Sequence, residues 1–144
     1  MSTVDPSQPR VQDPPPTSVG VRADRPRFLV RRLADAPVVE CHCGPSARLL
    51  TYPEADQINV HVTTIVDATE HYHKITTEYY YILEGNGTLY LDHQPIEVEP
   101  GTLVVIEPGV RHRLVSVTGV KTLVMGVPAL DPADEYFDED ASRT

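Results

Sequence analysis

The sequence predicts an all-β domain, a sandwich or barrel of antiparallel strands. Three observations support this prediction. The central part of the chain consists of short runs rich in β-branched and aromatic residues, and turn residues separate these runs at regular intervals. No stretch of this region combines a sustained helical period with a capping residue. Because the separating turns are short, we expect neighbouring runs to pair antiparallel.

The expected strands follow one another from residue 28 to residue 127. They are the runs 28–33, 47–52, 58–66, 77–83, 87–92, 95–99, 102–107, 112–117 and 121–127. Between them lie clusters of Gly, Pro, Asn and Asp, such as segments 84–87 and 107–109, which are typical of tight turns. The 144-residue chain is long enough for one core, so we expect a single domain over residues 27–127.

The two ends of the chain differ from this β-rich region. Residues 1–26 contain six prolines and almost no bulky apolar side chains, which predicts a disordered N-terminal tail. Residues 128–144 carry six acidic residues against one arginine, which predicts an acidic C-terminal tail exposed to solvent. Tyr136 and Phe137 leave a second possibility for this tail, docking against a partner or against the domain itself.

Charge and apolar patterning exclude some partners. The chain has a formal net charge of −9, and its central region has eight Lys and Arg against twelve Asp and Glu. Without a basic stripe we expect no nucleic-acid partner. The N-terminus lacks the apolar core of a signal peptide, and no apolar run reaches membrane-spanning length, so we expect a cytoplasmic protein with no membrane partner.

The chain has two cysteines, Cys41 and Cys43, separated only by His42. Cysteines this close rarely form a disulfide without strain, so we expect two reduced thiols. A zinc site that begins at Cys-His-Cys is the less favoured alternative, because no further cysteine follows.

The segment 71–78 contains three residues that can bind a metal. His71 and His73 stand two positions apart, so on a strand both side chains point to one face. Glu78 lies an odd number of residues beyond His73, and a bend in 74–77 is needed to return its carboxylate to that face. His112 follows the turn at 108–109. Three imidazoles and one carboxylate suit one divalent transition metal: Fe, Mn, Ni, Zn or Cu.

Such a centre favours chemistry over a purely structural role. Four single-atom ligands leave positions of a six-coordinate ion open for a substrate. If Glu78 faces inward, the strand period places Tyr80 and Ile82 inward and Tyr79 and Tyr81 outward. The Tyr80 hydroxyl could then orient a substrate or donate a proton, and packing in the barrel lining is the alternative. Tyr79 and Tyr81 are interpreted as packing residues or as a subunit contact.

Other polar residues near these positions are interpreted as less central. His61 lies within an expected strand and either packs in the core or lines the cavity. Arg111 and Arg113 flank His112 at the opposite parity, so both should face away from the metal. His93 lies in a turn and should be exposed.

The spacing of the metal-binding residues resembles the two motifs of the cupins. The first motif, G-x5-H-x-H-x3,4-E-x6-G, is matched except at its leading glycine, where Ile65 stands; the matching residues are His71, His73, Glu78 and Gly85. The second motif, G-x5-P-x-G-x2-H-x3-N, is matched at Gly101, Gly109 and His112. Glu107 and Ser116 replace its proline and asparagine, and all four ligand positions of the family are intact.

The resemblance covers residues 45–127 and implies an antiparallel jelly-roll barrel that encloses the metal. It also implies a homodimer, to which the Tyr79 and Tyr81 face and the run 28–33 would contribute. The expected function is a metal-dependent enzyme acting on a small molecule. With iron it would be dioxygenase-like, and with a Lewis-acid metal it would be an isomerase or lyase with Tyr80 as acid or base. The alternative is a non-catalytic module that binds a metal or a small ligand.

Overall fold

A computed structural model describes residues 27–138, so the proline-rich segment 1–26 and the last six residues of the acidic tail lie outside the described residues. The chain divides into two units, and the first ends at Val30. Its described residues, 27–30, form neither helix nor strand. The second unit begins at Arg31 and contains every described strand.

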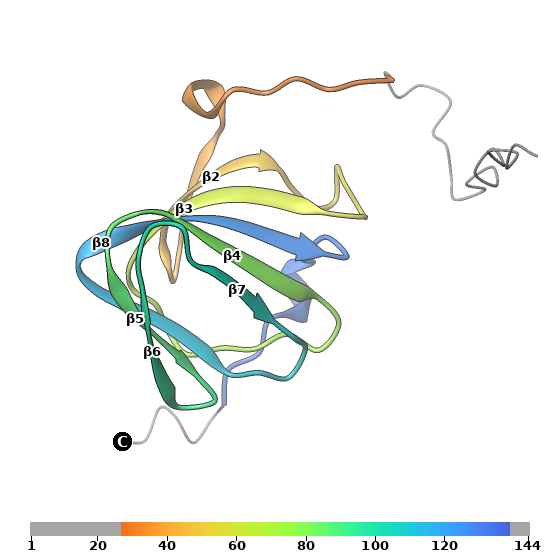
Figure 1. The fold of residues 1–144 in the computed structure, drawn as a ribbon. Coiled ribbons are helices and arrows are strands. Elements are labelled where there is room, and N and C mark those ends of the chain that lie inside the picture. The colour runs from red at the N-terminus through yellow and green to blue at the C-terminus, as the bar shows by residue number, and fades with distance from the viewer. Residues whose placement is uncertain (1–26, 139–144) are drawn as a thin grey trace, which may run out of the picture. The chain divides into compact units, whose positions relative to one another are not determined.

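The second unit is an all-β domain, as predicted (Figure 1). Its strands are β1 (Val38–Cys41), β2 (Gly44–Leu50), β3 (Asn59–Asp67), β4 (Thr77–Glu84), β5 (Gly87–Leu91), β6 (Gln94–Val98), β7 (Leu103–Ile106) and β8 (His112–Val127). Two short 3-10 turns, η1 (Leu33–Asp35) and η2 (Pro132–Asp134), lie at either end of the strand series. No helix in residues 27–138 has the length and apolar character needed to cross a membrane.

The strands form an antiparallel jelly-roll barrel whose two layers share strand β8. One layer has the order β1-β2-β3-β8-β4-β7, and β5 and β6 form the other layer with the first part of β8 (Figure 1). Residues 112–115 of β8 pair with β5, whereas residues 120–127 pair with β3 and β4. Gly119 lies between these parts with a φ of +97°, a conformation that glycine adopts without strain.

Three sequence expectations about strands are wrong. The runs 112–117 and 121–127 are one continuous strand, because the residues around Gly119 bend the chain between layers instead of reversing it. The run 28–33 is not a strand; residues 27–32 have no regular structure and η1 begins at Leu33. The apolar composition of this run does not by itself make it a strand, because a strand also needs a neighbouring strand to hydrogen-bond with. The first strand is instead β1, which pairs with β2 and which the sequence did not indicate.

The alternation of side chains in the strands divides the barrel interior into a core and a cavity. A buried apolar cluster occupies one part and includes Ile82, Leu89 and Leu114, each at most 1% exposed. Tyr80 and Val124 belong to this cluster and also line the cavity next to it. The cavity therefore lies directly beside the apolar core.

The described part of the acidic tail, residues 128–138, lies against the barrel, where the sequence favours a solvated tail. The backbones of Tyr72 and Tyr136 exchange two hydrogen bonds of 3.0 Å. Leu130 donates its backbone N–H to the Asn59 side chain at 2.8 Å, and Asp134 is buried. These polar contacts explain the difference, because they satisfy acidic and backbone groups that charge counting assigns to solvent. Residues 128–138 therefore follow the second possibility, docking against the domain itself.

The outer face of β4 carries Tyr79 and Tyr81, as the strand period predicts. Tyr79 is partly buried and Tyr81 is 40% exposed. Leu103 and Val105 of β7, next to β4, are also exposed. The homodimer through this face stays a prediction.

Candidate metal centre

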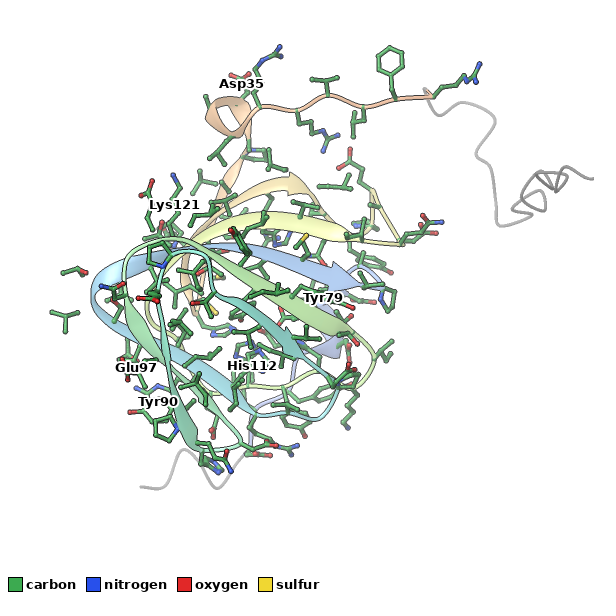
Figure 2. The ribbon with its side chains drawn as sticks, viewed as in Figure 1. Asp35, Tyr79, Tyr90, Glu97, His112 and Lys121 are labelled. Carbon is green, nitrogen blue, oxygen red and sulfur yellow. The ribbon has the colours of Figure 1, made fainter. Side chains whose placement is uncertain are left out.

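Four predicted residues come together inside the barrel: His71, His73, Glu78 and His112. One ligand atom from each lies within 4.8 Å of the others, and every residue of the group is at most 3% exposed. Figure 2 shows His112 pointing into the barrel interior from the start of β8. His71 and His112 form an isolated bridge with backbone hydrogen bonds of 3.0 and 3.2 Å, which places these two histidines side by side.

The predicted bend between His73 and Glu78 is present and has a specific support. Residues 74 and 75 form the bend, and β4 begins at Thr77 with Glu78 facing inward. The carboxylate of Asp134 accepts hydrogen bonds from three consecutive backbone N–H groups, those of Lys74, Ile75 and Thr76, at 2.9, 3.1 and 3.0 Å. A residue of the C-terminal segment therefore holds the turn that returns Glu78 to the histidines.

Each histidine of the group is oriented by a backbone carbonyl. His71 Nδ1 lies 2.8 Å from the Thr69 oxygen, and His112 Nδ1 lies 2.9 Å from the Val110 oxygen. His73 Nδ1 lies 2.7 Å from the backbone oxygen of Asp134. Because a carbonyl only accepts, each Nδ1 must carry the proton and donate it. Each Nε2 is thereby left to offer its electron pair towards the centre, as metal-ligating imidazoles do.

The carboxylate of Glu78 lies at the centre of these nitrogens. Its Oε2 is 3.1 Å from His73 Nε2 and 2.9 Å from His112 Nε2. Burial disfavours its charge, but when His112 and His73 carry a proton on Nε2 their contacts outweigh burial and hold the pKa of Glu78 well below its usual range. His112 Nε2 is buried and has no well-directed hydrogen bond among the described residues. A buried, unsatisfied nitrogen beside an ionised carboxylate fits a divalent metal.

The group borders a cavity of about 120 Å³. His71, Glu78 and Tyr80 line it together. Tyr80 points inward, as predicted, and its ring meets that of His112 edge-on with 6.0 Å between centroids. Burial, with Glu78 nearby, raises the pKa of the Tyr80 phenol well above its usual value, so the hydroxyl keeps its proton. Tyr80 belongs both to the apolar cluster and to the cavity lining, so its catalytic role and its packing role both stay predictions.

The remaining predicted residues lie where their parity places them. His61 lines the cavity and its Nε2 is 3.1 Å from the Thr51 hydroxyl. Arg111 lies over the ring of Tyr72, and Arg113 donates to Asp67 at 2.7 Å, so both point away from the metal group. These two arginines are outside the cavity.

Sequence reasoning missed a second polar group at the edge of the cavity. His42, which had no predicted role, lies 2.6 Å from a carboxylate oxygen of Glu135. Burial opposes the charge of Glu135, but the hydrogen bond from His42 outweighs burial and lowers the pKa of Glu135. His42, Cys43 and His71 also form a group whose ligand atoms lie within 4.8 Å of one another. His71 has one free nitrogen, so the two groups compete for it.

The family of the chain follows from its sequence and its fold together. A family model described as "Cupin domain" matches residues 61–127, which include both motifs and all four residues of the metal group. This chain belongs to the cupins. The match begins within β3 and ends with β8, so it spans the strands that carry the centre.

Solved structures share this cupin's fold. A protein from Planctomyces limnophilus is 30% identical, covers 80% of this chain and 99% of its own, and superposes with a TM-score of 0.69. Ectoine synthase from P. lautus is 20% identical, with 76% of this chain and 88% of its own covered and a TM-score of 0.65. Pac13 of Streptomyces, described as a nucleoside dehydratase, is 17% identical, with 76% and 89% covered and a TM-score of 0.64. The last two show the fold alone.

A relative among curated proteins matches a shorter region. Protein MJ1618 of Methanocaldococcus jannaschii is 34% identical over 55 residues. This match covers 38% of the cupin chain and 44% of MJ1618, less than half of the relative's length.

Proposed function

We propose that this cupin is a metal-dependent enzyme that acts on a small molecule. The centre would hold one divalent transition metal through the Nε2 atoms of His71, His73 and His112 and the carboxylate of Glu78. The observation that carries this proposal is the fixed orientation of the three imidazoles, whose Nδ1 atoms all donate to backbone carbonyls. If no cation were bound, the electron pairs of these buried Nε2 atoms and of the Glu78 carboxylate would face and repel one another. Only uptake of protons would relieve this repulsion.

The cavity beside the group supports an enzyme over a storage module. A bound cation supplies Lewis acidity to a substrate oxygen or, if it is iron, a site for dioxygen chemistry. Glu78 and His71 line this cavity, so the metal would lie at its wall, and Tyr80 would orient the substrate or donate a proton from its hydroxyl. The reaction would be dioxygenase-like or of the isomerase or lyase type. Ectoine synthase and Pac13 are enzymes, so this fold can house catalysis.

Metal binding is tested on protein purified without chelators and without a histidine tag. Elemental analysis should find about one transition metal per chain in the wild type. His73→Ala should lose it, whereas His93→Ala should keep it, because the His93 side chain is exposed and pairs with Glu70. A wild-type protein that binds no divalent ion after dialysis against each candidate would refute the metal centre.

Catalysis is tested separately from metal binding. Protein loaded anaerobically with Fe²⁺ is assayed for oxygen uptake over a panel of diols, thiols and phenols. Protein loaded with Zn²⁺, Mn²⁺ or Ni²⁺ is assayed for isomerised or eliminated products by mass spectrometry. Turnover that His112→Ala abolishes supports the enzyme. Stable metal binding without any turnover favours the non-catalytic module.

A further inference from the structure

The wall of the cavity formed by β2 and β3 is unusually polar for the interior of a barrel. In the β2–β3 register Ser46 faces Thr63 and Arg48 faces His61, and all four line the cavity. Thr63 donates to the Ser46 hydroxyl at 3.0 Å, and Thr51 extends the wall through its contact with His61. A folded core gains nothing from placing such groups inward, so a row of them beside the metal group indicates ligand binding.

The side chain of Arg48 carries a buried N–H group of this wall that lacks a hydrogen-bond partner. Its Nε is buried, and among residues 27–138 no oxygen accepts a hydrogen bond from it. The carboxylates that line the same cavity are engaged elsewhere, Glu78 with the metal-binding histidines and Glu135 with His42. A buried guanidinium N–H without an acceptor is costly, and a bound anion would remove that cost.

The neighbour of Arg48 does not share its charge. Burial, together with the charge of Arg48, lowers the pKa of His61 to about 4, so the imidazole is neutral near pH 7. Among the described residues that line the cavity, Arg48 is the only arginine or lysine. A ligand in this cavity meets the metal group at one wall and a single positive charge at the other.

We propose that Arg48 binds a carboxylate of the substrate, which makes the substrate of this cupin a small carboxylic acid with a second polar group for the metal. The inference rests on the proposed function for that second contact only. A guanidinium presents paired N–H groups that match the two oxygens of a carboxylate. Cavities for drug-sized ligands measure about 300–1,000 Å³, so 120 Å³ limits the substrate to a few carbon atoms.

The charges of the cavity favour a carboxylate over a phosphate ester. Arg48 is the charged group of this cavity that is left for a ligand, because Glu135 pairs with His42 and Glu78 belongs to the metal group. One guanidinium can offset a single negative charge, whereas a dianionic phosphate at the same position would leave one charge without a partner. The remaining donors of the wall, the hydroxyls of Ser46 and Thr51, suit a hydroxy or oxo group.

The test observes the Arg48 Nε–H directly by two-dimensional ¹H–¹⁵N NMR of zinc-loaded wild-type protein. The probes are glycolate, lactate and pyruvate, each with its neutral amide, and methyl phosphate. The resonance is assigned by its loss in Arg48→Lys. We expect at least one acid to shift this resonance saturably and its amide not to do so. The affinity of that acid, followed in both proteins through backbone amide resonances, should fall at least tenfold in Arg48→Gln.

The matched control is Arg113→Gln, which removes the same charge from the outer side of the barrel and should leave acid binding unchanged. The inference is overturned if no acid shifts the resonance, if amides bind as well as acids, if Arg48→Gln retains full affinity, or if methyl phosphate binds more tightly than every acid. Zinc binding is measured first by calorimetry. Its failure refutes the metal centre, and the acid titration of metal-free protein then still tests Arg48.

Discussion

The C-terminal segment should control both stability and metal binding through one side chain, that of Asp134. Asp134→Ala removes the carboxylate that accepts the backbone N–H groups of residues 74–76. It leaves the backbone oxygen that accepts from His73 Nδ1, because that atom belongs to the main chain. The substitution therefore separates support of the bend from orientation of the imidazole.

The expected loss follows from the number of bonds and their burial. Asp134 is 4% exposed, so its removal leaves three backbone donors without an acceptor. A hydrogen bond to a charged group contributes about 1.5–3 kcal/mol when it is buried. Here we take about 1 kcal/mol for each bond, because Lys74 and Ile75 are exposed and water can replace part of the lost hydrogen bonding. The free energy of unfolding should fall by about 3 kcal/mol. Asp134→Asn keeps one acceptor and should lose about half as much.

Urea denaturation in excess chelator measures this loss without any contribution from the metal. Zinc affinity, measured by competition with a chromophoric chelator, should fall about 10- to 100-fold, since Glu78 would no longer be held in place. Asp138→Ala is the control, because Asp138 contacts Arg111 on the outer surface of the same segment. Unchanged stability in Asp134→Ala would show that the carboxylate does not hold the bend. Reduced stability with unchanged zinc affinity would show that the bend does not position the ligands.

Three further predictions test other parts of the site and the barrel. Zinc at 100 times its Kd should raise the free energy of unfolding of the wild type by about 2.7 kcal/mol. In thermal melts Glu78→Gln should lose most of this gain, and an equal gain in the variant would exclude Glu78 as a ligand. Tyr80→Phe should keep the metal and lower kcat about 100-fold or more, and unchanged turnover would assign Tyr80 to packing. Gly85 and Gly101 have φ values of +86° and +91°, but an added Cβ would lie 2.3 Å from the Gly119 oxygen only at Gly85. Gly101→Ala should cost about 1 kcal/mol and Gly85→Ala at least about 2 kcal/mol more in urea denaturation; equal losses would contradict the close approach at Gly85.

Local patterns predicted the parts of the molecule that local geometry determines. The alternation from Glu78 through Tyr80 is a property of a single strand, and the structure agrees with it. The two-residue spacing of His71 and His73 also placed both residues in one group, although His71 forms an isolated bridge and neither residue belongs to a named strand. The bend before Glu78 was predicted for the same reason, because the odd spacing requires it. Turn residues marked most strand ends correctly, although Gly119 bends a strand instead of ending it.

Contacts between distant segments could not be read from the sequence. Asp134 supports residues that precede it by about 60 positions, and His42 meets Glu135 across 93 positions. Within a run of acidic residues nothing distinguishes Asp134 from its acidic neighbours. The sequence also did not mark Arg48 as a cavity residue. A single arginine in a strand usually lies at an edge or on the surface, and only the strand register shows which face Arg48 occupies.

Strand β8 has a consequence for the order in which this protein can acquire its structure. It forms hydrogen bonds with β3, β4 and β5, and it begins with His112. During synthesis the earlier strands emerge without the neighbour that all three share, so neither barrel layer can close until residue 127 is available. Pairings this far apart in the chain fold slowly, on a scale of milliseconds to seconds. A nascent chain should therefore expose unpaired strand edges, and lack a complete metal group, until residues 112–127 have been made.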